Sequence, residues 1–134
     1  MKKVIVISTS LRTGSNSDML ADRFIDGAKS AGNDVEKISL VGKNIQFCKG
    51  CFGCQKLGRC VIKDDVNDIM AKVLKADVIC WATPIYYYEM SGQMKTLIDR
   101  MNAMYPWTIS SATSICSQPQ PRMRSRLPNG PNRA

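Results

Sequence analysis

The chain has 134 residues, 44% of them hydrophobic and 22% charged, which allows one globular domain with a real hydrophobic core. Histidine is absent, and this excludes Ser-His-Asp and Cys-His catalysis and every metal site that needs imidazole. The formal net charge of +8 is shared equally between residues 1–106 and the short segment 107–134, so the body is only mildly basic. Such a body suits a small anionic ligand and argues against nucleic acid as a partner.

The chain order of the predicted elements is that of an α/β protein. Continuous runs of β-branched and apolar residues predict three buried strands, at residues 4–8, 35–40 and 78–83. Apolar residues that recur every three or four positions predict three helices, at residues 17–31, 65–75 and 91–105. The order β-α-β-loop-α-β-α predicts a parallel sheet with right-handed crossovers and the strand order 2-1-3.

The same spacing predicts the apolar face of each helix. In the first helix, Leu20, Phe24 and Ala28 recur at intervals of four residues. The apolar residues of the second helix are Val66, Ile69, Met70, Val73 and Leu74, and those of the third are Met94, Leu97, Ile98, Met101 and Met104.

A hydroxyl-rich loop, S-T-S-L-R-T-G-S-N-S at residues 8–17, joins the first strand to the first helix. This is where α/β sheets bind phosphate, because the amides of the first helical turn point outward and the helix dipole favours negative charge. The serine hydroxyls, the Asn16 amide and the Arg12 guanidinium add further donors. The loop is neither a P-loop nor a G-x-G-x-x-G fingerprint, and it favours a terminal phosphate monoester. Serine and asparagine are also ordinary turn and N-cap residues, which is the competing interpretation.

A second motif, A-T-P-I-Y-Y-Y-E-M-S-G-Q-M-K-T-L-I-D-R at residues 82–100, leaves the carboxyl end of the third predicted strand. In a 2-1-3 sheet this strand lies beside the first, so the motif borders the crevice in which α/β sheets bind ligands. Tyr86, Tyr87 and Tyr88 could flank a flat ring there. The alternative is that these tyrosines pack against the next helix or a partner subunit.

These two motifs resemble those of the flavodoxin-like NAD(P)H-dependent FMN reductases, and the resemblance covers residues 1–106. It implies an α/β flavodoxin-like doubly wound parallel sheet. It also implies that five residues of the loop bind the FMN phosphate, namely Ser10, Arg12, Ser15, Asn16 and Ser17. Four residues of the second motif would border the ribityl chain and the isoalloxazine, namely Thr83, Pro84, Ile85 and Tyr86. Thr9 stands where the family usually has glycine, a departure that would alter how closely the backbone approaches the phosphate.

Four cysteines follow the spacing C-x2-C-x2-C-x5-C, at Cys48, Cys51, Cys54 and Cys60. Four thiolates on a glycine-containing loop suit an iron–sulfur cluster or zinc, and free or redox-active thiols are the third interpretation. The spacing resembles that of the iron–sulfur flavoproteins, a branch of the same fold with a [4Fe–4S] cluster beside FMN. Other reductases of the family have a similar loop, so the three interpretations stay open.

Together, the motifs and the resemblance predict an FMN-dependent oxidoreductase that passes electrons from NAD(P)H through the flavin to an acceptor. No catalytic acid or base is assigned, because hydride transfer to a flavin needs stacked rings more than a titrating side chain. The alternatives are an electron-transfer relay with a [4Fe–4S] cluster and a non-catalytic FMN-binding module. The resemblance implies a homodimer. The absence of a long apolar segment or a signal peptide favours a cytoplasmic location without a membrane partner.

Residues 107–134 are rich in Ser, Pro and Arg and show neither helical nor strand periodicity. One interpretation is an irregular basic tail after a domain formed by residues 1–106. The resemblance implies a five-stranded sheet, whereas only three strands are found, so the fourth and fifth strands are expected to be missing. A truncated or frame-shifted C-terminus would explain this.

Overall fold

The computed structural model describes residues 1–104, and the predictions made for residues 107–134 lie outside this part. A parallel sheet forms its centre, with the strand order β2-β1-β3. The strands are β1 (Lys3–Ser8), β2 (Asp34–Ser39) and β3 (Val78–Ala82). The predicted strands and their 2-1-3 order are therefore confirmed, with boundaries that differ by one residue.

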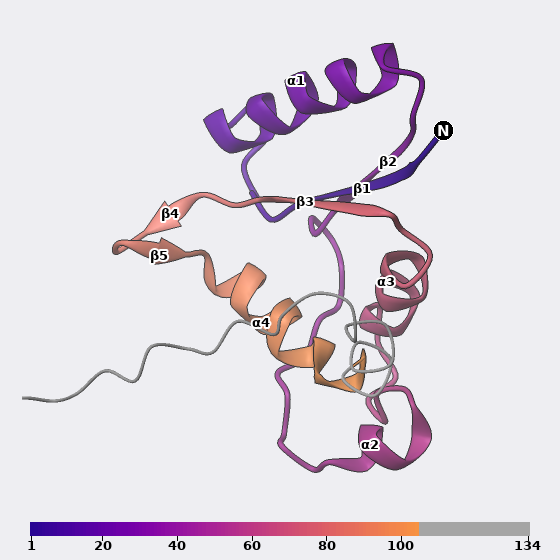
Figure 1. The fold of residues 1–134 in the computed structure, drawn as a ribbon. Coiled ribbons are helices and arrows are strands. Elements are labelled where there is room, and N and C mark those ends of the chain that lie inside the picture. The colour runs from indigo at the N-terminus through magenta and orange to yellow at the C-terminus, as the bar shows by residue number, and fades with distance from the viewer. Residues whose placement is uncertain (105–134) are drawn as a thin grey trace, which may run out of the picture.

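The central strand β1 supplies both faces of the core because successive side chains of a strand point to opposite sides. Val4 and Val6 pack against α1 (Asn16–Ser30) on one face. Ile5 and Ile7 belong to the larger cluster on the other face, together with residues of α3 (Val66–Val73) and α4 (Gly92–Arg100). Figure 1 shows this layering, with α1 on one side of the sheet and α3 and α4 on the other.

The face that α1 turns to the sheet is shifted by one residue from the predicted stripe. Ala21 and Ile25 are buried against β1, whereas Leu20 and Phe24 are 73% and 41% exposed. Ala21 is small enough to let the helix approach the valines of β1 closely. The larger Leu20 side chain turns instead toward the loop that precedes the helix, where it lines a cavity.

Two other helices agree more closely with the sequence pattern. Val66, Ile69, Met70 and Val73 of α3 are buried, while Leu74 is 47% exposed after the last helical residue. The third predicted helix ends at Arg100 and continues as the 3-10 turn η1 (Met101–Met104). Of its predicted apolar residues, Met94 and Leu97 are fully buried.

Two short elements were not expected from the sequence. A single helical segment, α2 (Gly53–Leu57), interrupts the cysteine loop. The segment after β3 folds into a hairpin of β4 (Ile85–Tyr86) and β5 (Glu89–Met90), which projects away from the sheet in Figure 1. The hairpin turn consists of Tyr87 and Tyr88, both with positive φ, of 48° and 64°. Such turns normally contain glycine or asparagine, so the three tyrosines did not indicate one.

Candidate functional site

The hydroxyl-rich loop lies where β1 ends and α1 begins, at the carboxyl edge of the sheet. Ser15 is the N-cap of α1, and its hydroxyl accepts a hydrogen bond from the Asp18 backbone N–H at 3.3 Å. The preceding turn passes through Gly14, whose φ of 67° is readily adopted by glycine. The loop therefore delivers its residues directly onto the positive end of the helix.

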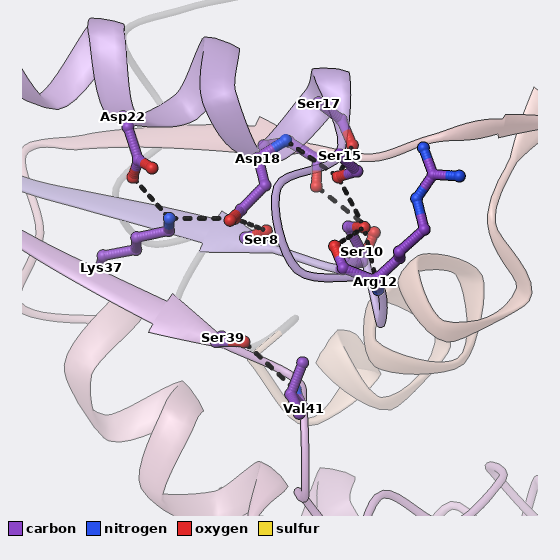
Figure 2. A network of polar contacts seen from close by, with 12 residues as sticks. Ser8, Ser10, Arg12, Ser15, Ser17, Asp18, Asp22, Lys37, Ser39 and Val41 are labelled. Carbon is purple, nitrogen blue, oxygen red and sulfur yellow. Dashed lines mark hydrogen bonds and ion pairs between the residues drawn. The ribbon is translucent and has the colours of Figure 1, made fainter.

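A network of serine hydroxyls fixes the shape of the loop, as Figure 2 shows. Ser15 Oγ donates to Ser10 Oγ at 2.7 Å and shares a hydrogen bond with Ser17 Oγ at 3.2 Å. Ser10 Oγ in turn donates to the Arg12 carbonyl and accepts from the Arg12 backbone N–H. Ser10 and Ser15 are buried. Their hydroxyls therefore bond to other protein groups instead of water, and this makes the loop rigid.

Several hydrogen-bond donors of this loop have no acceptor among residues 1–104, and such donors suit the binding of an anion. Within the described part of the chain, the backbone N–H groups of residues 13–17 take part in none of the hydrogen bonds found. Those of Asn16 and Ser17 belong to the first helical turn, which has no intrahelical acceptor for them. The Arg12 side chain is exposed and forms no ion pair with residues 1–104. Together these groups form a cradle for an oxyanion such as a phosphate.

The other wall of the site comes from the segment that follows β3. It is attached to the loop through the hydroxyls of Thr9, Thr83 and Ser91, of which the sequence analysis did not single out Ser91. Thr9 Oγ1 shares a hydrogen bond with Ser91 Oγ at 3.1 Å and donates to the Ala82 carbonyl. Thr83 Oγ1 donates to Ser91 Oγ at 3.2 Å and accepts from the Ser91 backbone N–H. Ser91 is fully buried and is also the N-cap of α4.

Thr9, the position at which this sequence departs from the family pattern, thus has a defined place. Its side chain is 1% exposed and is directed to Ala82 and Ser91. It does not line the cavity between the two motifs. The threonine therefore ties β1 to β3 and α4, and it leaves the loop surface free.

A cavity of about 530 Å³ lies between the loop and the segment after β3. The nine residues predicted from the two motifs all line it, and Leu20 is the one further residue: Ser10, Arg12, Ser15, Asn16, Ser17, Leu20, Thr83, Pro84, Ile85 and Tyr86. The serines, Asn16 and Arg12 contribute polar groups to its lining, and Leu20, Pro84 and Ile85 contribute apolar side chains. This combination suits a ligand with an anionic head and a flat apolar body.

The three consecutive tyrosines occupy two different environments. Tyr86 lines the cavity. Tyr87 and Tyr88 are 96% and 97% exposed at the tip of the hairpin, with their ring centroids 5.9 Å apart. Neither of them packs against the helix that follows, so of the interpretations considered for these two residues this one is wrong.

An acidic side chain, that of Asp18, lies beside the anion cradle, and Lys37 compensates its negative charge. Asp18, in the first turn of α1, accepts hydrogen bonds from Ser8 Oγ at 2.8 Å and from Lys37 Nζ at 2.9 Å. Lys37 also pairs with Asp22 at 2.5 Å. The hydrogen bonds with Lys37 and Ser8 hold the pKa of Asp18 below its ordinary value. Burial acts to lower the pKa of Lys37, but its hydrogen bonds with Asp22 and Asp18 outweigh this and raise it.

The cysteine loop forms a separate site at the C-terminal end of α4. Cys48 and Cys51 are exposed, and Cys54 and Cys60 are half-buried. All four line one cavity of about 320 Å³. Within residues 1–104, no three Cys, Asp or Glu side chains are arranged to hold a single metal ion. A four-iron cluster makes a different demand, since each thiolate then binds its own iron atom at a different corner.

An ion pair at the base of this loop has no exposed atoms. Arg100 and Asp64 form a two-pronged pair with distances of 2.6 and 2.9 Å, and both side chains are 0% exposed. Burial acts to raise the pKa of Asp64, but the hydrogen bonds from Arg100 and from backbone N–H groups outweigh this and lower it. Burial likewise acts to lower the pKa of Arg100, and its partners, Asp64 first, raise it above the ordinary value.

Comparison with known proteins assigns the chain to a family. Residues 2–114 match the family described as NADPH-dependent FMN reductase. The chain belongs to this family, and its sheet is flavodoxin-like. None of the helices in residues 1–104 has the length and apolar character needed to cross a bilayer.

Several of the relatives are named iron–sulfur flavoproteins. One from Archaeoglobus fulgidus is 37% identical over 75% of this chain and 46% of its own length. One from Methanocaldococcus jannaschii is 39% identical over 73% of this chain and 51% of its own length. A Bacillus subtilis protein with the provisional name NAD(P)H-dependent FMN-containing oxidoreductase is 35% identical over 73% of this chain and 51% of its own length. The chain spans about half the length of these relatives.

Solved structures agree with the fold. The protein RosB, with a bound formylriboflavin phosphate intermediate, superposes with a TM-score of 0.64 at 19% identity, over 76% of this chain and 42% of RosB. An NAD(P)H:quinone oxidoreductase from Methanothermobacter marburgensis gives 0.62 at 16% identity, over 74% of this chain and 52% of its own. At these identities the likeness supports the fold alone.

Proposed function

We propose that this chain binds FMN in the cavity between residues 8–17 and 82–90 and acts as an FMN-dependent oxidoreductase. The observation that carries the proposal is the lining of that cavity, which combines an anion cradle with an apolar wall. Its lining fits FMN, because it combines hydroxyls and a guanidinium, which suit a phosphate, with a proline and aliphatic side chains, which suit a flat ring. The family description and the flavoprotein names of the relatives agree with this ligand.

In this proposal the loop residues bind the phosphate. Arg12 supplies the positive charge, Ser17 supplies a hydroxyl, and the first turn of α1 supplies N–H groups, while Ser10 and Ser15 hold the loop in shape. Thr83, Pro84, Ile85 and Tyr86 would border the ribityl chain and the isoalloxazine. We assign the backbone amides near residues 85–87 to polarising the ring. No side chain of the cavity is assigned as a general acid or base.

FMN, when bound, supplies hydride acceptance and electron transfer. The protein would contribute the residues that hold and orient the ring, namely the cavity residues of the segment after β3. We propose NAD(P)H as the electron donor, supported by the family description, and a small molecule or protein as acceptor. A homodimer and a cytoplasmic location remain part of this proposal.

The test is an anaerobic turnover assay on the purified chain with added FMN. The proposal predicts that NADPH or NADH reduces FMN in the presence of the chain, and that oxidation continues beyond one equivalent of FMN only when an acceptor such as a quinone is also present. FMN binding without any NAD(P)H oxidation would instead establish the alternative of a non-catalytic FMN-binding module. Sedimentation of the FMN-loaded chain decides between monomer and homodimer.

A second candidate is an electron relay in which the cysteine loop holds a [4Fe–4S] cluster. Two observations favour it: all four cysteines line one cavity, and several relatives carry iron–sulfur in their names. Cys48, Cys51, Cys54 and Cys60 would bind the cluster, which would supply one-electron transfer. Iron and acid-labile sulfide assays on protein purified without air test this, and a flavin spectrum with neither element would contradict it.

A further inference from the structure

Arg100 connects the last turn of α4 to both ends of the cysteine loop. Its Nη1 donates to the Gln46 carbonyl at 2.7 Å, before the first cysteine. Nη1 and Nη2 donate to the Asp64 carboxylate, after the last cysteine. Its Nε donates to Cys60 Sγ at 3.2 Å. One guanidinium therefore closes the base of the loop and also contacts a sulfur inside it.

The geometry of these bonds matters more than their number. A guanidinium is planar, so once Asp64 binds Nη1 and Nη2 the direction of the Nε–H bond is fixed. That fixed N–H bond points at Cys60 Sγ. A lysine could neutralise Asp64 but could not donate to the carboxylate and the sulfur in one plane.

Stability alone is a poor explanation for this arrangement. Burying two opposite charges costs desolvation that their attraction only partly recovers, so a buried ion pair is weak evidence for a stabilising role. The exposed pair of Lys95 and Asp99 on the same helix shows that α4 also has solvated positions for charge. The buried position of Arg100 is explained by what the guanidinium reaches there.

We propose that Arg100 is a positioning residue of the cysteine site, which fixes the Cys60 sulfur toward the cavity that Cys48, Cys51 and Cys54 also line. This inference rests on the cysteine site of the proposed function and not on FMN. Because Ser91 at the other end of α4 holds Thr83 in the first cavity, one helix of nine residues joins the two sites. Figure 1 shows α4 running from the β4–β5 hairpin toward α2.

The most direct test observes the Arg100 Nε–H group by NMR in the full chain without metal. Cys60→Ala removes the sulfur and leaves the bonds to Asp64 and Gln46 in place, so the variant is expected to fold. The Nε–H resonance is expected to move and to exchange with water about tenfold faster. Cys60→Ser keeps an acceptor and should restore part of the protection. Cys51→Ala is the matched control and should leave the signal unchanged.

An Nε–H resonance that is the same in wild type, Cys60→Ala and Cys60→Ser would overturn the proposal. A change that appears equally in Cys51→Ala would also overturn it, because it would reflect general loosening of the loop.

A second measurement addresses the function of the contact. Arg100→Lys and the control Lys95→Gln are compared after anaerobic reconstitution with iron and sulfide, with circular dichroism and FMN affinity as checks on folding. The proposal predicts at least about a tenfold loss of bound iron in folded Arg100→Lys, as expected for removing one charge-assisted hydrogen bond, and none in Lys95→Gln. Unchanged iron in folded Arg100→Lys would contradict it.

The two measurements separate this inference from the proposed function. A wild-type chain that takes up no iron would refute the cluster, and the Nε–H signal would still decide the role of Arg100. Should Arg100→Lys fail to fold, the cysteine variants still show whether the Nε–H bond is directed at Cys60.

Discussion

At the scale of single residues, the anion cradle is made of groups that have no partner within residues 1–104. The N–H groups of residues 13–17 and the Arg12 guanidinium form no hydrogen bond with this part of the chain, while the Ser10 and Ser15 hydroxyls stiffen the loop. These residues therefore divide into those that shape the cradle and those that would contact a phosphate. Among the residues of the described cavity, Arg12 is the one charged side chain in the second group.

Arg12→Gln is expected to weaken FMN binding by about 10- to 100-fold, since a charge-assisted hydrogen bond contributes about 1.5–3 kcal/mol. Riboflavin, which lacks the phosphate, should bind the variant and the wild type equally well. Fluorescence titration with both ligands measures this difference. Arg23→Gln, which removes an exposed positive charge from α1, is the control for net charge, and equal losses in the two variants would refute a specific role for Arg12.

The Asp18 network predicts a pH dependence of stability. The folded-state pKa of Asp18 lies below its ordinary value of 3.8, so its ionised form stabilises the fold above that pH. This contribution is lost as the pH falls through the lower, folded-state pKa. Asp18→Asn should therefore be less stable than wild type at neutral pH, with a difference that shrinks as the pH falls below 3.8.

Urea unfolding at several pH values measures this effect. Asp26→Asn, at an exposed position on the same helix, is the control, and its free energy of unfolding should depend on pH as that of the wild type does. A constant difference between wild type and Asp18→Asn down to strongly acidic pH would contradict the assignment.

Residues of the candidate site could be predicted from the sequence where they belong to a local motif. The nine predicted residues come from two short segments, and the resemblance of these segments to a known family was sufficient to name residues that line one cavity. The contacts of Thr9 with Ser91 and of Arg100 with Asp64 and Cys60 join residues that are 36 to 82 positions apart. No local pattern encodes such contacts, and the fully buried Arg100 looked like an ordinary basic residue at the end of a helix.

At the scale of elements, the β4–β5 hairpin is the least conventional part of the fold. Its two turn residues adopt a backbone conformation that costs a non-glycine residue about 1–2 kcal/mol. Both side chains are almost fully exposed, so burial in the described structure does not offset this cost. The turn could not be predicted, because tyrosine is typical of strands rather than of turns with positive φ.

Tyr88→Gly is expected to raise the free energy of unfolding by about 0.5–1 kcal/mol, because it relieves the positive φ and part of the gain is lost to the flexibility of glycine. Urea unfolding of the dilute chain measures this. A clear loss of stability that appears only at high protein concentration would show instead that the tyrosine contacts a second copy of the chain.

At the scale of the whole molecule, the three-stranded sheet and its two faces were predictable because the strands are continuous apolar runs and the helices are amphipathic. The rotation of α1 was not predictable, since Ala21 and Leu20 are both apolar and only the packing against β1 selects the smaller one. The arrangement of the cysteine loop was equally unpredictable, because Arg100 contacts both of its ends and Cys60 from positions 36 to 54 residues away.

Leu97 tests whether this core holds the two sites together. It is fully buried where α4 packs on the sheet, and Leu97→Ala should lower the free energy of unfolding by about 2–5 kcal/mol. Leu74→Ala, at a position that is 47% exposed, should cost much less. Similar losses for the two variants in urea unfolding would show that α4 is not part of a cooperative core.

The function proposed for residues 8–17 and 82–100 depends on one binding mode. In it FMN lies across the carboxyl ends of β1 and β3, with its phosphate on the loop of residues 8–17. Titrating FMN with the purified chain, shown to be folded by circular dichroism, tests this through the fluorescence of the flavin. We expect saturable quenching with one FMN per chain, and binding of riboflavin at least about tenfold weaker. A folded chain that leaves FMN fluorescence unchanged, or that binds riboflavin as tightly as FMN, would refute this binding mode.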